Sequence, residues 1–218
     1  MKKKTSSSPS RPRMKFDPDF ATAIPAVKAI KAGVISSSEL TKHVFKRIQK
    51  HNKKINAFVT LNEEQALRQA RKADNNLAKG IKLGPLHGLP IVIKDQFRTA
   101  GLRTTCGFPD LADYIPKTNA VAVQKLLDAG AILVGKTNTP VGASDIQTDN
   151  KVAGTTHNQW EVTRTAGGST GGGAAALAAG LGFLELGADL AGSIRTPSNF
   201  CGVCGHKSSL NLVSAQGA

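Results

Sequence analysis

Residues 88–95 read GLPIVIKD, and residues 120–134 read AVAVQKLLDAGAILV. The β-branched run at 89–93 is typical of a buried strand, and a second short apolar run follows at 131–134. Between them, residues 120–129 have the composition of a helix, which Gly130 ends. A strand, a helix and a second strand in this order favour two parallel neighbours in one sheet. We therefore predict an α/β fold.

The chain before this unit is predicted to be helical over residues 20–80. An apolar pattern at 26–30 is stopped by Gly33, and the sequence SSSE at 36–39 is typical of the start of a new helix. A third helix is expected over 63–77, which is rich in Ala, Leu, Glu and Arg. Residues 165–193 differ, since a Gly/Ser loop leads into a small-residue helix at 174–179 and then into a second loop.

The charge distribution separates a tail from a domain. The net charge is +14, and residues 1–15 hold six of the 29 lysines and arginines and no acid. We predict a basic disordered tail at 1–19 and a single domain at 20–218. The remaining basic residues are scattered over helix-like stretches, which is typical of solvated faces, so nucleic-acid binding is not expected.

Composition also bears on the compartment. No run approaches the ~18 to 20 apolar residues that cross a bilayer, and the N-terminus lacks the apolar core of a secretory signal. The three cysteines, Cys106, Cys201 and Cys204, are an odd number, which fits reduced thiols. We expect a cytoplasmic protein with no membrane association.

The loop GGSTGGG at 167–173 precedes a helix and could hold an anion with its backbone N–H groups. It lacks the GK[ST] ending of nucleotide-binding loops. On its composition alone, a flexible linker is an equally good interpretation.

Three segments together are more specific than this loop. They are GLPIVIKD at 88–95, GGSTGGGAAALAAG at 167–180 and LGADLAGSIRTPSNFCGVCGH at 186–206, and in this order and spacing they resemble the amidase signature family. The resemblance covers about residues 25–215. It implies a mixed sheet core flanked by helices. Because members of that family are about twice as long, it also implies an N-terminal part whose C-terminal half is missing, with an open sheet edge at which a second copy or another chain could associate.

The resemblance assigns a catalytic triad of Lys94, Ser169 and Ser193. Ser193 would be the nucleophile, Ser169 a bridging serine held by a cis peptide bond, and Lys94 the base. A lysine accepts a proton only when it is neutral, which requires burial or a positive neighbourhood to lower its pKa. A lysine at the end of an apolar strand meets that requirement.

The resemblance also implies an oxyanion hole formed by the backbone N–H groups of Leu190, Ala191, Gly192 and Ser193. One position departs from the family, which commonly has glycine where this chain has Ala191. A Cβ atom restricts positive φ and could crowd the substrate.

The site loop is expected to include Gly167, Gly168 and Thr170, the last in place of a second serine. Asp189 and Arg195 match polar family positions and are interpreted as structural supports. Cys201 and Cys204 have a CxxC spacing, yet no second pair completes a zinc site. We therefore predict no metal and no cofactor, and we interpret His157 and His206 as structural.

The predicted function is that of an amidase, which hydrolyses the carbon–nitrogen bond of a small-molecule amide through an acyl-enzyme. Two alternatives remain open. One is the A-type subunit of a tRNA-dependent amidotransferase, which shares the signature, although residues 145–158 and His206 look more like stand-alone amidases. The other is an inactive truncated fragment.

Overall fold

A computed structural model of the chain describes residues 16–218, and its centre is a mixed four-stranded sheet. The strands are β1 (Phe58–Leu61), β2 (Pro90–Lys94), β3 (Ile132–Thr137) and β4 (Glu185–Leu186), in the order β1-β3-β2-β4. Strand β2 is parallel to β3 and to β4, whereas β1 is antiparallel to β3. The predicted α/β class and the parallel pairing of the two apolar runs are confirmed.

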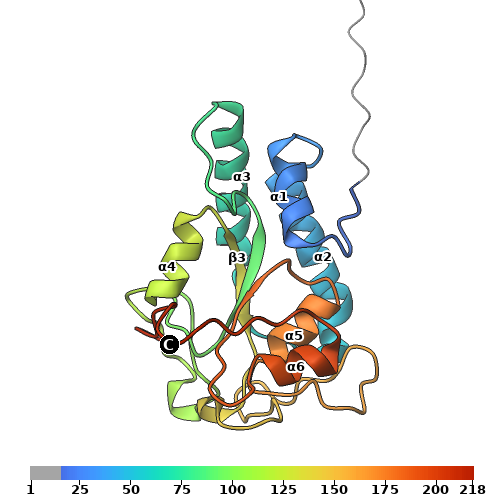
Figure 1. Cartoon of the computed structure of the whole chain (residues 1–218), viewed down its shortest axis with the longest axis vertical. Coiled ribbons are helices and arrows are strands. Elements are labelled where there is room, and N and C mark those ends of the chain that lie inside the picture. Colours follow the sequence, from blue (N-terminus) through green and yellow to red (C-terminus); the bar gives the residue numbers. More distant parts are fainter. Residues whose placement is uncertain (1–15) are drawn as a thin grey trace, which may run out of the picture.

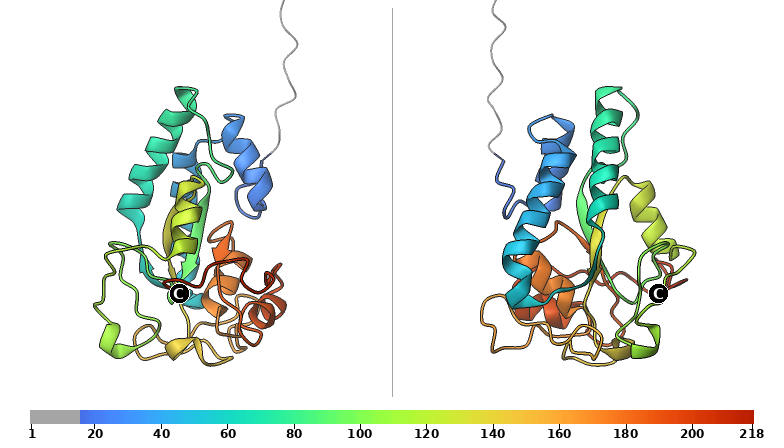
Figure 2. Two further views of the ribbon diagram at one scale, coloured as in Figure 1. Left: turned by 60° about the vertical axis from the view of Figure 1, so that its left-hand side comes forward. Right: turned by 180° about the vertical axis from the view of Figure 1, so that it is seen from behind.

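Six α-helices surround this sheet in the described part of the chain (Figures 1 and 2). Helix α1 and the C-terminal end of α3 lie at one end of the molecule, α5 and α6 lie side by side at the other, and the long helix α2 runs between the two ends to pack on α5. The bounds are α1 (Ala23–Lys31), α2 (Ser37–Ile55), α3 (Glu63–Ala78), α4 (Val121–Asp128), α5 (Gly171–Ala178) and α6 (Arg195–Cys201), with 3-10 turns at Pro109–Leu111 and Val141–Ala143. Within residues 16–218, no helix combines the length and the apolar character that crossing a bilayer requires.

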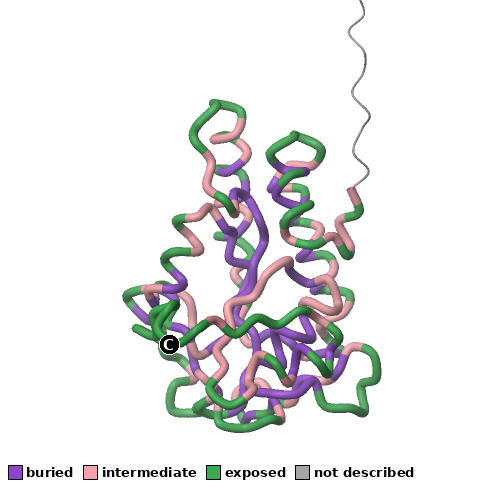
Figure 3. The backbone as a smooth tube through the Cα atoms, in the orientation of Figure 1, coloured by how far each residue is buried: buried purple, intermediate pink, exposed green. Residues whose placement is uncertain are grey.

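Both faces of the sheet pack against helices, and every residue of β2 is buried (Figure 3). Val92 and Val134 pack in a core cluster with residues of α2 and α5. Ile91, Ile93 and Leu133 pack in a second cluster with residues of α1 and α4. Strands β2 and β3 therefore each have one face toward α5 and the other toward α1 and α4.

An irregularity in β3 decides which of its last residues face α5. Ile91 pairs with Leu133, but the next residue, Val92, pairs with Gly135, so β3 has one extra residue here. From that point Thr137 lies beside Lys94, and Lys136 lies beside Ile93. Because side chains alternate along a strand, Lys94 and Thr137 share the α5 face, and Lys136 belongs to the opposite face.

The three predicted N-terminal helices are confirmed, and the second begins with a capping box. Ser36 Oγ accepts the N–H of Glu39 at 3.0 Å, and the Glu39 carboxylate accepts the N–H of Ser36 at 2.9 Å. The prediction missed β1, a strand of four residues between two helices.

Two boundaries differ from the predictions. Helix α5 begins at Gly171, not at residue 174, so three residues assigned to the loop form its first turn. The folded part also begins before residue 20, because Phe16 packs against the second core cluster and Asp19 contacts His43 at 2.6 Å and Arg47 at 3.0 Å. Residues 1–15 lie outside the described residues.

Candidate active site

Lys94 ends β2 at the carboxyl edge of the sheet, and its side chain is 0% exposed. Its Nζ donates a hydrogen bond of 2.6 Å to Ser169 Oγ. Burial lowers the pKa of Lys94 to about 8, and the negative charge of Glu185 partly opposes this effect. A substantial fraction of the side chain is therefore neutral in weakly basic solution, as a base requires.

Ser169 lies just before α5 in a loop that neighbouring threonines hold in place. The Gly168–Ser169 peptide bond is cis, as the resemblance implied. The hydroxyl of Thr139 donates to the carbonyl of Ser169 at 2.9 Å, and that of Thr148 donates to the carbonyl of Gly167 at 2.8 Å. These bonds fix the backbone on both sides of the cis bond, so the Ser169 hydroxyl stays directed at Lys94.

A close backbone approach explains the glycine before Ser169. A Cβ atom at Gly168 would lie 2.6 Å from the carbonyl oxygen of Asp145, well inside van der Waals contact. The segment around Asp145 therefore seals this side of the loop. Any larger residue at 168 would push the two segments apart and displace Ser169.

Ser193 lies in the loop between β4 and α6 and is partly exposed. Its carbonyl oxygen accepts the N–H of Thr170 at 3.1 Å, which places it beside the residue that follows Ser169. Within residues 16–218 no hydrogen bond is made by the Ser193 hydroxyl. The structure thus joins Lys94 to Ser169 through their side chains, and it brings Ser193 to this pair through the backbone.

The loop before Ser193 is organised by Asp189, whose side chain is buried. Its carboxylate accepts the N–H groups of Gly192 at 2.8 Å, Ile194 at 3.1 Å and Arg195 at 3.1 Å. The guanidinium of Arg195 donates two further bonds of 3.0 Å to it. The Arg195 guanidinium holds the pKa of Asp189 well below its usual range, and the three N–H groups add to this shift. Asp189 and Arg195 therefore support the loop.

These contacts change the expected oxyanion hole. The N–H of Gly192 is used by Asp189, which differs from the prediction that it faces the substrate. In the described part of the chain, the N–H groups of Leu190, Ala191 and Ser193 have no hydrogen-bond partner. Ala191 is absent from the residues with positive φ, so its Cβ causes no backbone strain there. Three of the four N–H groups therefore have no partner in the described residues, and their role as an oxyanion hole stays a prediction.

A second buried lysine lies on the opposite face of the sheet, and the sequence reasoning did not single it out. Lys136 Nζ lies 3.4 Å from Asp95 Oδ1, and both side chains are 0% exposed. It donates to the carbonyl of Phe97 at 2.7 Å and to the hydroxyl of Thr104 at 2.9 Å. Burial lowers the pKa of Lys136 to about 8, against the charge of Asp95. These contacts tie the segment after β2 to β3.

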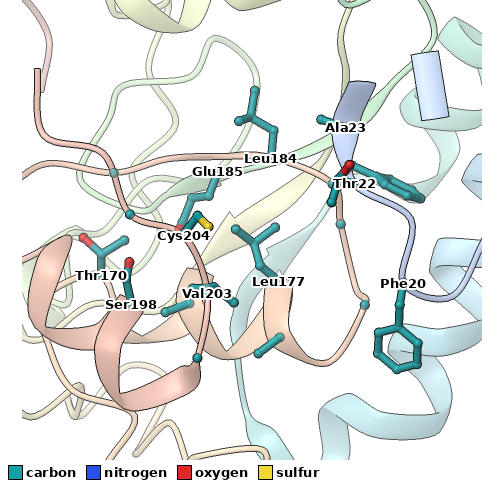
Figure 4. Close-up of a pocket in the computed structure, with 18 of the residues that line it drawn as sticks. Phe20, Thr22, Ala23, Thr170, Leu177, Leu184, Glu185, Ser198, Val203 and Cys204 are labelled. Atoms are coloured by element: carbon teal, nitrogen blue, oxygen red, sulfur yellow. The ribbon is translucent and has the colours of Figure 1, made fainter. Parts of the chain in front are cut away.

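A cavity of about 740 Å³ opens beside the site (Figure 4). Thr170 and Ser198 line one end, and Phe20 and Thr22, from the segment before α1, line the other. Glu185 of β4 also contributes to the wall, although sequence reasoning gave it no role. The cavity reaches Ile194, the residue after Ser193.

The cysteines and histidines make separate contacts, although Cys204 and His206 line the same cavity. Cys201 is buried and contacts the carbonyl of Ala166 at 3.4 Å, whereas Cys204 is exposed. His157 Nδ1 contacts the carbonyl of Val162 at 2.9 Å, and His206 lines the cavity. Among residues 16–218 there is no cluster of three or more His, Cys, Asp or Glu side chains suited to a metal ion.

A buried lysine that donates to a serine, with a second serine on the adjoining loop, is the arrangement that a serine hydrolase with a lysine base requires. The chain belongs to the amidase family, whose sequence profile matches residues 39–218. The family resemblance of the three segments is thereby confirmed.

Known relatives agree with this assignment. The chain is 43% identical over 198 residues to the A-type subunit of the glutamyl-tRNA(Gln) amidotransferase of Carboxydothermus hydrogenoformans, a match that covers 91% of this chain and 41% of the relative. The native peptide amidase of Stenotrophomonas maltophilia has a TM-score of 0.86 at 32% identity, covering 90% of this chain and 42% of that one. A crystal structure of another amidase has a TM-score of 0.84 at 37% identity, covering 91% and 45%. The chain thus spans less than half the length of these proteins.

Proposed function

We propose that this chain carries the catalytic residues of an amidase that hydrolyses a small-molecule amide. The observation that carries the proposal is the 2.6 Å hydrogen bond between the buried Nζ of Lys94 and Ser169 Oγ. A lysine whose pKa is lowered to about 8 can take a proton from a hydroxyl, which an exposed lysine in its charged form cannot do.

The proposed reaction proceeds in two stages. Neutral Lys94 takes the proton of Ser169 while Ser169 takes that of Ser193, and the Ser193 oxygen forms a bond to the amide carbon. The N–H groups of Leu190, Ala191 and Ser193, which have no partner within residues 16–218, donate to the negative charge that develops on the carbonyl oxygen. The proton returns through Ser169 to the leaving nitrogen as the C–N bond breaks. A water molecule then attacks the acyl carbon and gives a proton to the same relay. The bond between the acyl carbon and Ser193 Oγ breaks, the relay returns the proton to Oγ, and the carboxylic acid leaves.

The test is labelling by a fluorophosphonate, followed by mapping of the modified peptide. We expect the label on Ser193, and we expect Ser193→Ala to lose both labelling and amide hydrolysis while its melting transition is unchanged. Ser198→Ala is the matched control, because Ser198 lines the same cavity and has no role in the proposed relay. Labelling of Ser198, or equal labelling of Ser193→Ala, would contradict the assignment of the nucleophile.

A second candidate function is that of the A-type subunit of a tRNA-dependent amidotransferase. The observation that favours it is the 43% identity to the glutamyl-tRNA(Gln) amidotransferase relative. Both candidates use the same triad, so the substrate separates them. Glutamine hydrolysis, copurification with tRNA, and glutamine-dependent amidation after addition of partner subunits support the amidotransferase. Hydrolysis of simple amides without glutamine hydrolysis supports the amidase.

The chain spans 41% of the relative's length. That these 218 residues are active on their own is therefore a further part of the proposal. An inactive fragment is the competing interpretation, and turnover of an amide by a folded preparation removes it. A cytoplasmic location is also proposed, supported by three cysteines without disulfides. Cell fractionation tests this part.

A further inference from the structure

Glu185 is an acidic side chain that the proposed reaction does not use. It begins β4 and pairs with Val92 of the parallel strand β2. Since residues i and i+2 of a strand point to the same face, Lys94 lies on the same face of the sheet as Glu185. Thr137 of β3 shares this face through its pairing with Lys94. Three neighbouring strands thus contribute one polar group each to the layer under α5.

The contacts of Glu185 hold its carboxyl group in that layer. The hydroxyl of Thr137 donates to Glu185 Oε1 at 2.5 Å. On the other side the carboxyl group lies against Gly173 of α5, in the space that a Cβ atom at residue 173 would occupy. Ser169, the partner of Lys94, lies just before the same helix. The acid is therefore clamped between β3 and α5, close to the lysine that contacts Ser169.

Burial acts on the two groups in opposite directions. It raises the pKa of Glu185 to about 8, although the bond from Thr137 and the charge of Lys94 oppose the change. It lowers the pKa of Lys94 to about 8, and Glu185 is the largest opposing influence. Each group in its charged form therefore favours the charged form of the other.

We propose that Glu185 is a positioning residue that sets the charge of Lys94: ionised, it keeps the lysine protonated and so delays the appearance of the neutral base as pH rises. The inference rests on the proposed function, in which Lys94 is the base. Glu185 acts through Lys94 and does not touch the reacting atoms.

Other ionisable groups face this pair and stay in place when Glu185 is changed. The charge of Asp189 and the thiol of Cys106 also face Lys94. The thiol of Cys201 in α6 faces Glu185, and burial raises the pKa of Cys201 to about 12, so this thiol stays neutral. Asp189 is already bound by Arg195. A variant that removes only the charge of Glu185 therefore tests the effect of this one carboxylate on Lys94.

The experiment is a titration of the lysine side chains by NMR, with carbon-13 at Cε, in the 218-residue chain and in Glu185→Gln. Glutamine keeps the size and the acceptor for Thr137 but cannot carry a charge. We expect the midpoint of Lys94 to move to lower pH by roughly one unit, the lower end of what a nearby opposite charge produces. The signal is assigned by its loss in Lys94→Gln.

Two controls accompany this variant. Lys136 is the internal reference, because it is buried on the other face beside Asp95, and its midpoint should not move. Glu63→Gln removes the same charge from an exposed position in α3 and should leave Lys94 unchanged. An equal shift of Lys94 in both glutamine variants would overturn the inference, because it would show an effect of net charge alone.

Thr137→Val gives a second route that does not depend on folding of the first variant. It removes the donor that stabilises ionised Glu185, so the pKa of Glu185 rises further and that of Lys94 falls in the same direction as in Glu185→Gln. An unmoved Lys94 midpoint in the folded variants contradicts the inference even if amide hydrolysis persists. If Lys94 shifts but no amide is hydrolysed by the parent, the proposed function fails and the control of Lys94 by Glu185 stands.

Discussion

Lys94 and Lys136 show that a lowered pKa does not by itself identify a base. Both side chains are fully buried, and burial lowers the pKa of each to about 8. Lys136 donates hydrogen bonds to a carbonyl and to a threonine hydroxyl and forms an ion pair with a carboxylate, none of which leads to a second nucleophilic hydroxyl. Within residues 16–218, Lys94 has a single hydrogen bond, and its acceptor is a serine hydroxyl that can pass on a proton. The partners, more than the shift, separate the catalytic candidate from the structural lysine.

A pH dependence follows for the base. Because only neutral Lys94 accepts a proton, kcat/KM should rise with pH through about 8 and fall about tenfold per unit below it. Lys94→Ala should remove activity. Lys94→Arg should not restore it, because a guanidinium stays protonated. Rates measured from about pH 6 to about pH 10 on one amide check both points, and substantial turnover by the arginine variant would rule out the base role.

At the scale of elements, apolar runs were predictable and short strands were not. The two central strands were visible because both of their faces are buried, whereas β4 has two residues and depends on its pairing with β2. The start of α5 was misplaced because glycine is a poor helix former. At Gly171 a Cβ atom would collide with the Thr148 side chain, so packing overrides propensity there.

The residues of the candidate site also fall into a group that the sequence predicted and a group that it did not. The residues Lys94, Ser169 and Ser193 stand in matched segments, so the resemblance could point to them. The contribution of Glu185 could not be foreseen, because it depends on the extra residue in β3, which turns Thr137 toward the α5 face. The use of the Gly192 N–H by Asp189 is likewise a matter of loop geometry. Neither the contact of Thr137 with Glu185 nor that of Gly192 with Asp189 can be predicted from the spacing of residues in the sequence.

The close packing of α5 predicts that an alanine at residue 172 destabilises the protein, although alanine is a better helix former than glycine. Gly172→Ala should destabilise the protein by about 1 to 3 kcal/mol, because its Cβ would press on backbone atoms of Asn138 and Ala57. Ala178→Gly, in the last turn of the same helix, should cost no more than about 1 kcal/mol. Urea unfolding of both variants measures the two free energies. A stabilised Gly172→Ala would show that the helix can shift away from β3.

At the scale of the whole molecule, polar contacts and exposed apolar groups meet at β4. Among the described strands, β4 pairs only with β2, so its other edge offers unpaired backbone groups. Nearby segments expose large side chains, with Leu190 at 96%, Leu210 at 85% and Leu212 at 73% of their surface. An open edge beside apolar groups is a common site of chain association.

We therefore predict that the chain self-associates as its concentration rises. Light scattering after size-exclusion chromatography should show the mass increase, and Leu210→Lys combined with Leu212→Lys should reduce it. Ile81→Lys is the control, because Ile81 is also exposed but belongs to the segment that follows α3, which lies at the far end of the molecule from β4 (Figure 1). A monomer at every concentration would contradict the prediction.

The contact between Gly173 and Glu185 has a consequence for sequence variation among homologues. A residue with a Cβ atom at 173 and a glutamate at 185 would compete for the same space. The two positions should therefore covary: homologues with serine or alanine at the first should have a small residue at the second. In those homologues the lysine equivalent to Lys94 would lack its acidic neighbour. Its base would then become neutral at a lower pH than in proteins with Gly173 and Glu185. Coupled substitutions at positions 173 and 185 would therefore divide the homologues into two groups with different pH dependence.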